Sequence, residues 1–75
     1  MIRYRLKELI AEKEFQDGTR LTLEKLAKDT GLHRTTLSKI ANNKGYNATT
    51  DILDKFCEYF DVRIDQVLEY IDKKE

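Results

Sequence analysis

The stretch that decides the fold is Leu23-Glu24-Lys25-Leu26-Ala27-Lys28-Asp29-Thr30-Gly31-Leu32-His33-Arg34-Thr35-Thr36-Leu37-Ser38-Lys39-Ile40. Apolar residues recur at helical spacing on both sides of Gly31, which predicts one short helix over about Leu23 to Asp29 and another over about His33 to Asn42. Thr22 precedes the first of them as an N-cap, typically worth about 1 kcal/mol. Gly31 supplies the left-handed backbone that a tight turn between the two helices needs.

Small and apolar positions in this stretch match a helix-turn-helix. Ala27 lies where the helices approach most closely, and a larger side chain would push them apart. Four apolar residues pin the pair to the rest of the domain: Leu26, Leu32, Leu37 and Ile40. Counted from Leu23, these residues together with Ala27 and Gly31 occupy positions 4, 5, 9, 10, 15 and 18, and all six match the DNA-binding pattern. The alternative is an ordinary pair of packed helices, which would match only one or two positions by chance.

The flanking segments also predict helices. Apolar spacing indicates a helix from Ile2 to about Glu14, one that follows an N-cap at Thr49 or Thr50, and a last one over about Ile64 to Asp72. Gly45 is expected to end the helix that precedes it, as a left-handed residue. No strand alternation is visible. The expected fold is therefore all-α, a compact five-helix domain whose second and third helices form the helix-turn-helix; a four-helix bundle fits less well, because bundle helices are longer and nearly parallel.

Length and composition restrict the class of protein. Seventy-five residues predict a single domain over 1–75 that buries roughly 60% of its unfolded surface. No apolar run approaches the roughly 20 residues of a membrane span, and no signal core is present, so we expect no membrane association and no export. The lone cysteine, Cys57, lies on an apolar helical stripe; we expect it to be buried core in a reducing, cytoplasmic environment rather than a nucleophile.

Several of these segments resemble one family, the XRE-like regulators of the phage Cro and lambda-repressor type. Residues 26–32 resemble its Leu-Ala-x-x-x-Gly-hydrophobic core, residues 37–45 the end of its recognition helix and the following turn, and residues 53–68 its fourth and fifth helices. Two positions depart from it: Leu23 stands where the family often has a phosphate-binding Gln, and His33 stands where it prefers Ser or Thr. The resemblance implies double-stranded DNA as partner, no cofactor, and binding as a two-fold homodimer.

Exposed residues in the first turns of a recognition helix meet base edges in the major groove. The expected base-reading residues are Arg34, Thr35, Ser38 and Lys39. The expected phosphate-binding residues are Thr22, Lys28, His33, Thr36, Asn42, Asn43, Lys44 and Tyr46. Alternatives remain open at several of them: Arg34 and Lys39 as a solvated face, Asn43 as part of a helix stop, and Tyr46 as cover for the core edge. Nothing shows metal-ligand spacing or a catalytic constellation, so we expect no metal site and no enzyme activity.

These observations predict a sequence-specific double-stranded DNA-binding regulator of bacterial or phage origin, a repressor that acts by occupying an operator. The candidate dimer surface includes Tyr59, Val62, Tyr70 and Ile71. The alternative is a protein-binding module, such as an antitoxin component that uses the same fold, since fold alone does not assign function.

The distribution of charge agrees with DNA binding although the net charge is zero. Residues 28–47 contain four basic side chains and one acid, whereas residues 48–75 contain four basic and eight acidic ones. The positive segment is the one expected to face phosphate. Weak overall attraction then requires specific contacts to supply more of the affinity.

Overall fold

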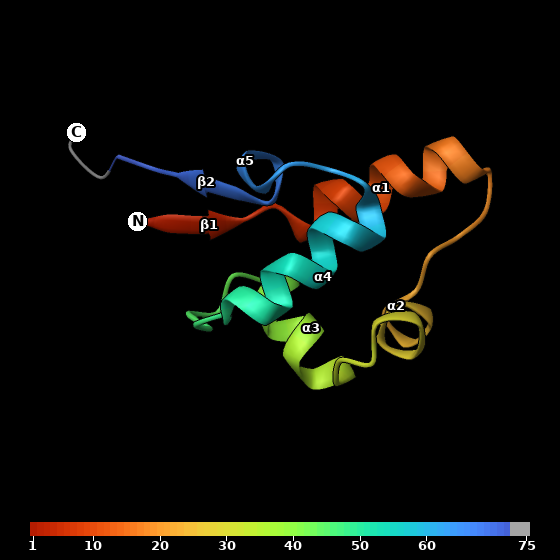
Figure 1. Ribbon diagram of the computed structural model, residues 1–75, viewed down its shortest axis with the longest axis horizontal. Coiled ribbons are helices and arrows are strands. Elements are labelled where there is room, and N and C mark those ends of the chain that lie inside the picture. The colour runs from red at the N-terminus through yellow and green to blue at the C-terminus, as the bar shows by residue number, and fades with distance from the viewer. Residues whose placement is uncertain (73–75) are drawn as a thin grey trace.

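The computed structural model describes residues 1–72. Along the chain, one short strand comes first, five helices follow, and a second short strand comes last (Figure 1). The elements are β1 Ile2–Tyr4, α1 Leu6–Asp17, α2 Leu23–Thr30, α3 Arg34–Ala41, α4 Thr50–Phe60, α5 Ile64–Val67 and β2 Leu68–Tyr70. The predicted five-helix domain with a helix-turn-helix, α2 and α3, is confirmed.

The two ends of the described chain form a small antiparallel sheet, so the prediction of helix at both ends is wrong. Ile2 pairs with Tyr70, Arg3 with Glu69 and Tyr4 with Leu68. As a result α1 begins only at Leu6, and α5 is a single turn rather than a helix to Asp72. A three-residue strand is too short to show alternation, and its partner lies at the other end of the sequence, so local periodicity does not reveal it.

The core lies between the helices and under the inner end of the sheet. Its buried residues are Leu6, Leu9, Leu21, Leu26, Leu37, Ile40, Ala41, Ile52, Phe56 and Val67. The expected pins Leu26, Leu37 and Ile40 are therefore buried, and Leu32 is half-buried against them. Cys57 is half-buried against this core rather than fully buried as predicted.

The connection between α1 and α2 contains a buried leucine, and it begins later than the sequence predicts. Leu21, in the connection between α1 and α2, is buried, and its N–H donates to Glu14 Oε2 at 2.8 Å. α1 continues to Asp17 and ends at Gly18, which has a φ of +69°, three residues beyond the predicted end at Glu14. Residues 15–17 are thus helical, because the left-handed residue that ends α1 is Gly18.

α3 ends at an asparagine rather than at the predicted Gly45. Asn43 has a φ of +54° and its N–H donates to Ile40 O, while the Lys44 N–H donates to Lys39 O. This pair of hydrogen bonds is the Schellman pattern, with Asn43 as its left-handed residue. Gly45 is also left-handed, at φ +75°, but it lies two residues further on, in the loop.

Candidate nucleic-acid interface

Local hydrogen bonds shape the turn that orients α3 on α2. The Thr22 hydroxyl accepts from the Lys25 N–H (3.1 Å), which confirms the predicted N-cap of α2. At the other end Gly31, at φ +79°, donates its N–H to Ala27 O at 2.8 Å. The Thr30 hydroxyl donates to Leu26 O (2.7 Å) and accepts from the Leu32 N–H (3.3 Å). These bonds, all within residues 22–32, fix both ends of α2 and the turn that leads to α3.

The four residues predicted to read bases lie on α3. Arg34, Thr35 and Lys39 are exposed, and Ser38 is partly exposed. Positions 34 and 38, and positions 35 and 39, are each separated by four residues, so two neighbouring rows of side chains form one polar helix face. The Asn42 amide donates to Ser38 O at 3.0 Å and to Ser38 Oγ at 3.4 Å, which extends this face to the end of the helix. The alternative reading of a solvated face remains compatible with the same exposure.

An acid on α2 contacts this face and was not singled out from the sequence. Glu24 Oε2 lies 3.4 Å from Arg34 Nε, and both side chains are more than 60% exposed. Exposed pairs of this kind contribute little to stability. The pair places a carboxylate beside Nε of Arg34, one of the four residues predicted to read bases. Glu24 and Arg34 are ten residues apart and lie on different helices, so the i, i+3 and i, i+4 spacing within one helix does not predict their contact.

Most of the predicted phosphate-binding residues surround the same two helices. Thr22 and His33 are the N-cap residues of α2 and α3, where unpaired backbone N–H groups favour an anion. The His33 ring makes no capping hydrogen bond. Lys28 and Lys44 are exposed, at the end of α2 and just after α3, and Asn42 is exposed at the C-cap of α3. Thr36 is partly buried.

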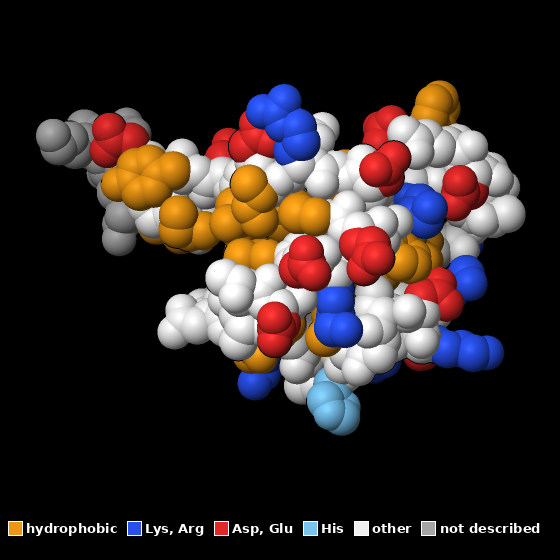
Figure 2. Space-filling model, in the orientation of Figure 1, with side chains coloured by type: hydrophobic (Ala, Val, Ile, Leu, Met, Phe, Trp, Pro, Cys, Tyr) orange, Lys and Arg blue, Asp and Glu red, His pale blue; other side chains and the backbone are white. Residues whose placement is uncertain are grey.

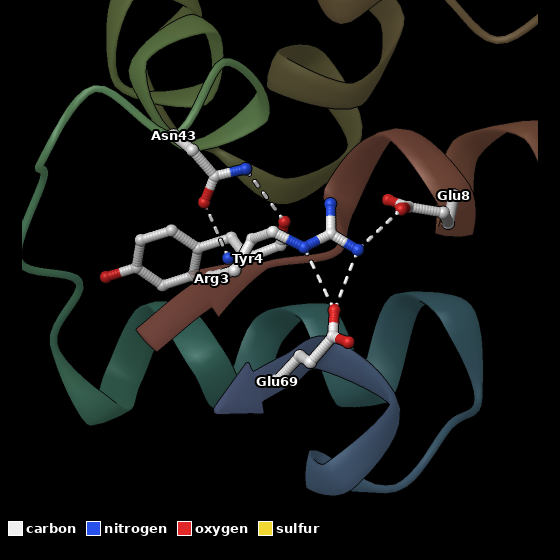
Figure 3. Close-up of polar contacts among 5 residues, drawn as sticks. All are labelled: Arg3, Tyr4, Glu8, Asn43 and Glu69. Carbon is white, nitrogen blue, oxygen red and sulfur yellow. Dashed lines mark hydrogen bonds and ion pairs between the residues drawn. The ribbon is translucent and has the colours of Figure 1, made fainter. Parts of the chain in front are cut away.

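The Asn43 side chain, predicted to contact phosphate, is hydrogen-bonded within the protein, and its phosphate contact stays a prediction. Its Oδ1 accepts from the Tyr4 N–H at 2.7 Å and its Nδ2 donates to Tyr4 O at 3.0 Å, so both ends of the amide bind the backbone of β1 (Figure 3). The amide replaces a neighbouring strand at this edge of the sheet. Of the two roles considered for Asn43, the structure supports the helix stop and adds a clamp on β1.

Tyr46 lies half-buried against the core, as its alternative reading expected. Its carbonyl oxygen accepts from the Tyr4 hydroxyl at 2.6 Å, and the same hydroxyl accepts from the Ala48 N–H at 2.9 Å. Tyr4 therefore holds the loop between α3 and α4 through its side chain, and the end of α3 through its backbone.

The one acid in the positive segment, Asp29, is turned toward neighbours. Its carboxylate accepts from the Tyr59 hydroxyl at 2.8 Å and lies 3.3 Å from Lys25 Nζ. The Tyr59 hydrogen bond, together with Lys25, lowers the pKa of Asp29 below its ordinary value. Burial and the same hydrogen bond raise the pKa of Tyr59 to about 12. The neutral Tyr59 hydroxyl of α4 thus stabilises the charged form of the Asp29 carboxylate.

Basic side chains remain open on the α2–α3 side. Within residues 1–72, Lys28, Lys39 and Lys44 have no carboxylate within ion-pair distance. Figure 2 shows Lys, Arg and His side chains along the lower edge of the molecule, where α2 and α3 lie, and many Asp and Glu side chains over the upper part. The sorting of charge that the sequence indicated is therefore seen in space.

Residues 1–72 contain no group of three His, Cys, Asp or Glu placed to hold a metal ion. In the same residues, no helix combines the length and the apolar character that crossing a bilayer requires.

A family model described as a Cro/C1-type HTH DNA-binding domain matches residues 5–73. Searches of the curated proteins and of the solved structures give no match. The matched range includes all five helices, and with them the surface formed by α2 and α3.

Proposed function

This chain belongs to the Cro/C1-type family of helix-turn-helix DNA-binding domains, and from that premise we propose that it is a sequence-specific regulator of transcription. It binds double-stranded DNA in the cytoplasm of a bacterium or of a phage-infected cell and represses by occupying an operator. The observation that carries the proposal is the polar, exposed face of α3 beside the N-termini of α2 and α3 and beside three lysines that have no ion-pair partner within residues 1–72.

Base recognition comes from α3 placed in the major groove with its N-terminus leading. Arg34 and Lys39 donate to guanine O6 and N7, and Thr35 and Ser38 form hydrogen bonds or contact a thymine methyl group. Each bidentate contact discriminates against a wrong base by about 1–3 kcal/mol. Among the four, Arg34 has the geometry for bidentate donation once it leaves Glu24.

Backbone recognition comes from the edges of the same surface. Phosphates bind at the N-termini of α2 and α3, next to Thr22 and His33, and at the exposed side chains of Lys28, Asn42 and Lys44, with Thr36 and the loop at Tyr46 beside them. These contacts set the register of the protein on the duplex without specifying sequence. Net neutrality of the chain keeps non-specific attraction weak.

The active species is a homodimer. Two copies related by a two-fold axis place their α3 helices about 34 Å apart, in successive major grooves on one side of the duplex. The operator is accordingly a palindrome, with half-sites separated by about one helical turn.

Selection from a random duplex pool, followed by titration at several salt concentrations, tests the proposal. We expect an enriched palindromic site and an affinity that falls linearly with the logarithm of salt concentration. Arg34→Ala should relax preference at one base position, at a cost of about 1–3 kcal/mol. Arg63→Ala is the matched control, because Arg63 is also an exposed, ion-paired arginine, at the start of α5.

The proposal fails if no site is enriched and binding stays weak at low salt. A protein partner that co-purifies in that case would favour the alternative, a protein-binding module such as an antitoxin component.

A further inference from the structure

The loop between α3 and α4, residues 42–49, contains neither helix nor strand. Within the described structure, residues 45–48 of this loop make two hydrogen bonds, and both involve the Tyr4 hydroxyl of β1. That hydroxyl donates to Tyr46 O at 2.6 Å and accepts from the Ala48 N–H at 2.9 Å. The path of the loop therefore depends on a side chain that is 42 and 44 residues away in the sequence.

Tyr4 binds the chain on both sides of Lys44. On one side, the N–H and C=O of Tyr4 are hydrogen-bonded to the Asn43 amide at 2.7 and 3.0 Å (Figure 3). On the other side, the Tyr4 hydroxyl binds the backbone two and four residues after Lys44. Lys44 and Gly45 thus lie on a short span between two attachments to one residue.

Lys44 needs these attachments because its own surroundings leave it unrestrained. Its side chain is exposed, and within residues 1–72 no carboxylate lies within ion-pair distance of it. The next residue, Gly45, is left-handed at φ +75°, and a Cβ built on it would contact nothing. Glycine adopts many backbone conformations, so a loop held only by its own residues would spread the Lys44 ammonium over many positions. Ordering such a group at the moment of binding costs affinity.

We propose that Tyr4 is a positioning residue for DNA binding, which holds the loop so that the Lys44 ammonium meets a phosphate oxygen beside the end of α3. Tyr4 acts through Lys44 and not by contact with DNA, since its hydroxyl and its backbone are bound within the protein. The inference rests on the proposed function, in which Lys44 binds phosphate. It adds β1, which lies outside the helix-turn-helix, to the parts of the fold that shape the DNA-binding surface.

A role of Tyr4 in folding alone makes a different prediction. The Tyr4 ring packs half-buried against the core, so its loss would lower the free energy of unfolding. Tyr4→Phe keeps the ring and the Asn43 contact with the backbone, and removes the hydroxyl. If Tyr4 served stability only, the folded molecules of this variant would bind DNA as the parent does. Binding is therefore measured at a temperature where circular dichroism shows each variant to be folded.

Titration of the selected operator at several salt concentrations gives the first test. One phosphate contact contributes a slope of about −0.9 to log K against log salt, which is about eightfold in affinity between about 1 M and 0.1 M salt. Tyr4→Phe should weaken binding by up to about eightfold and reduce the salt slope by up to about 1. Base preferences should stay unchanged, because phosphate contacts do not specify sequence. Tyr70→Phe is the matched control, since it removes a hydroxyl from a side chain of β2 that is 72% exposed.

A double-variant cycle shows whether Tyr4 acts through Lys44. In a Lys44→Ala chain, Tyr4→Phe should change the affinity by less than about twofold, because the contact that it positions is already absent. In an Arg34→Ala chain it should have its full effect, because position 34 is held by α3 and not by the loop. The proposal is overturned by equal effects in these two chains, by parent affinity and salt slope in Tyr4→Phe, or by an equal loss in Tyr70→Phe.

Hydrogen exchange at the Ala48 amide tests the positioning without DNA. This amide should be protected in the parent and exchange at least about tenfold faster in Tyr4→Phe, while the amides of α4 keep their protection. Unchanged exchange at Ala48 would refute the inference even where DNA binding is normal. A parent chain that binds no duplex refutes the proposed function, whereas a parent that binds normally beside an unaffected Tyr4→Phe refutes the role of Tyr4 alone.

Discussion

Replacing Asn43 tests whether one side chain fastens the β1–β2 ribbon to the end of α3. Its amide makes two hydrogen bonds to the Tyr4 backbone, at 2.7 and 3.0 Å, and its own backbone is left-handed at φ +54°. Asn43→Gly removes both bonds but keeps a residue that tolerates this φ. Asn43→Ala removes the bonds and also adds left-handed strain.

The structure gives the expected sizes of the two effects. Two partly buried hydrogen bonds at about 1 kcal/mol each predict a loss of about 2 kcal/mol in the free energy of unfolding for Asn43→Gly. Left-handed strain at alanine adds about 1 kcal/mol, for a total of about 3 kcal/mol in Asn43→Ala. For a domain of this size, the loss in Asn43→Gly corresponds to a melting temperature lower by roughly 8–16 °C.

Urea and thermal unfolding followed by circular dichroism measure these losses, and hydrogen exchange at the Tyr4 amide reports the clamp itself. That amide should exchange slowly in the parent chain and quickly in Asn43→Gly. Asn47→Gly, at an exposed loop position, is the control and should stay within about 0.5 kcal/mol of the parent. If Asn43→Gly also stays within that range with Tyr4 still protected, the clamp does not stabilise the ribbon and the reasoning is refuted.

Three further predictions concern the charges around α2 and α3. Glu24→Gln frees the Arg34 guanidinium and removes a negative charge beside DNA, so the dissociation constant for the operator, measured by fluorescence anisotropy, should fall a few-fold. Lys44→Ala should weaken binding to all sequences alike and reduce the salt slope by about 1. Tyr59→Phe removes the hydrogen bond to Asp29 and should lower the urea midpoint near neutral pH. The difference in urea midpoint between Tyr59→Phe and the parent should vanish at very low and at very high pH. The lowered pKa of Asp29 contributes stability only above the ordinary Asp range, and this contribution is lost as the carboxylate is protonated. The raised pKa of Tyr59 contributes stability only until the pH passes about 12, where the hydroxyl ionises.

Matched variants keep these three predictions sharp. Glu58→Gln and Lys55→Ala change exposed charges on α4 and should leave operator affinity and the salt slope nearly unchanged. If Glu58→Gln changes operator affinity as much as Glu24→Gln does, or Lys55→Ala changes the salt slope as much as Lys44→Ala does, overall charge rather than the α2–α3 surface controls binding. If Tyr59→Phe lowers the urea midpoint by the same amount at acid, neutral and alkaline pH, the variant has lost packing and not the hydrogen bond.

Local chemistry made the helix-turn-helix predictable. The Thr22 cap, the left-handed Gly31 and the pins Leu26 and Leu37 act within one or two turns of helix, so their residue types and spacing are sufficient. Exposure of Arg34, Thr35 and Lys39 followed from the same periodicity. Their contacts with bases remain predictions, which the exposure permits.

Contacts between distant residues were not predictable in this way. The sheet joins Ile2 to Tyr70, and the Asn43 clamp joins residues 39 apart in sequence. An asparagine at this position can end a helix or bind a phosphate, and only the position of Tyr4 shows that the Asn43 amide is hydrogen-bonded to β1.

The sequence by itself therefore determined the two crossing helices, their turn, the polar face of α3 and the separation of charge along the chain, because each depends on residues close together in it. The tertiary structure alone decided that the ends of the described chain form a sheet, that Asn43 closes the edge of that sheet, and that Glu24 holds Arg34. It also decided that Ile2 and Tyr70 share an exposed face. These last features arise because packing of the core brings together residues from opposite ends of the chain, which no local pattern encodes.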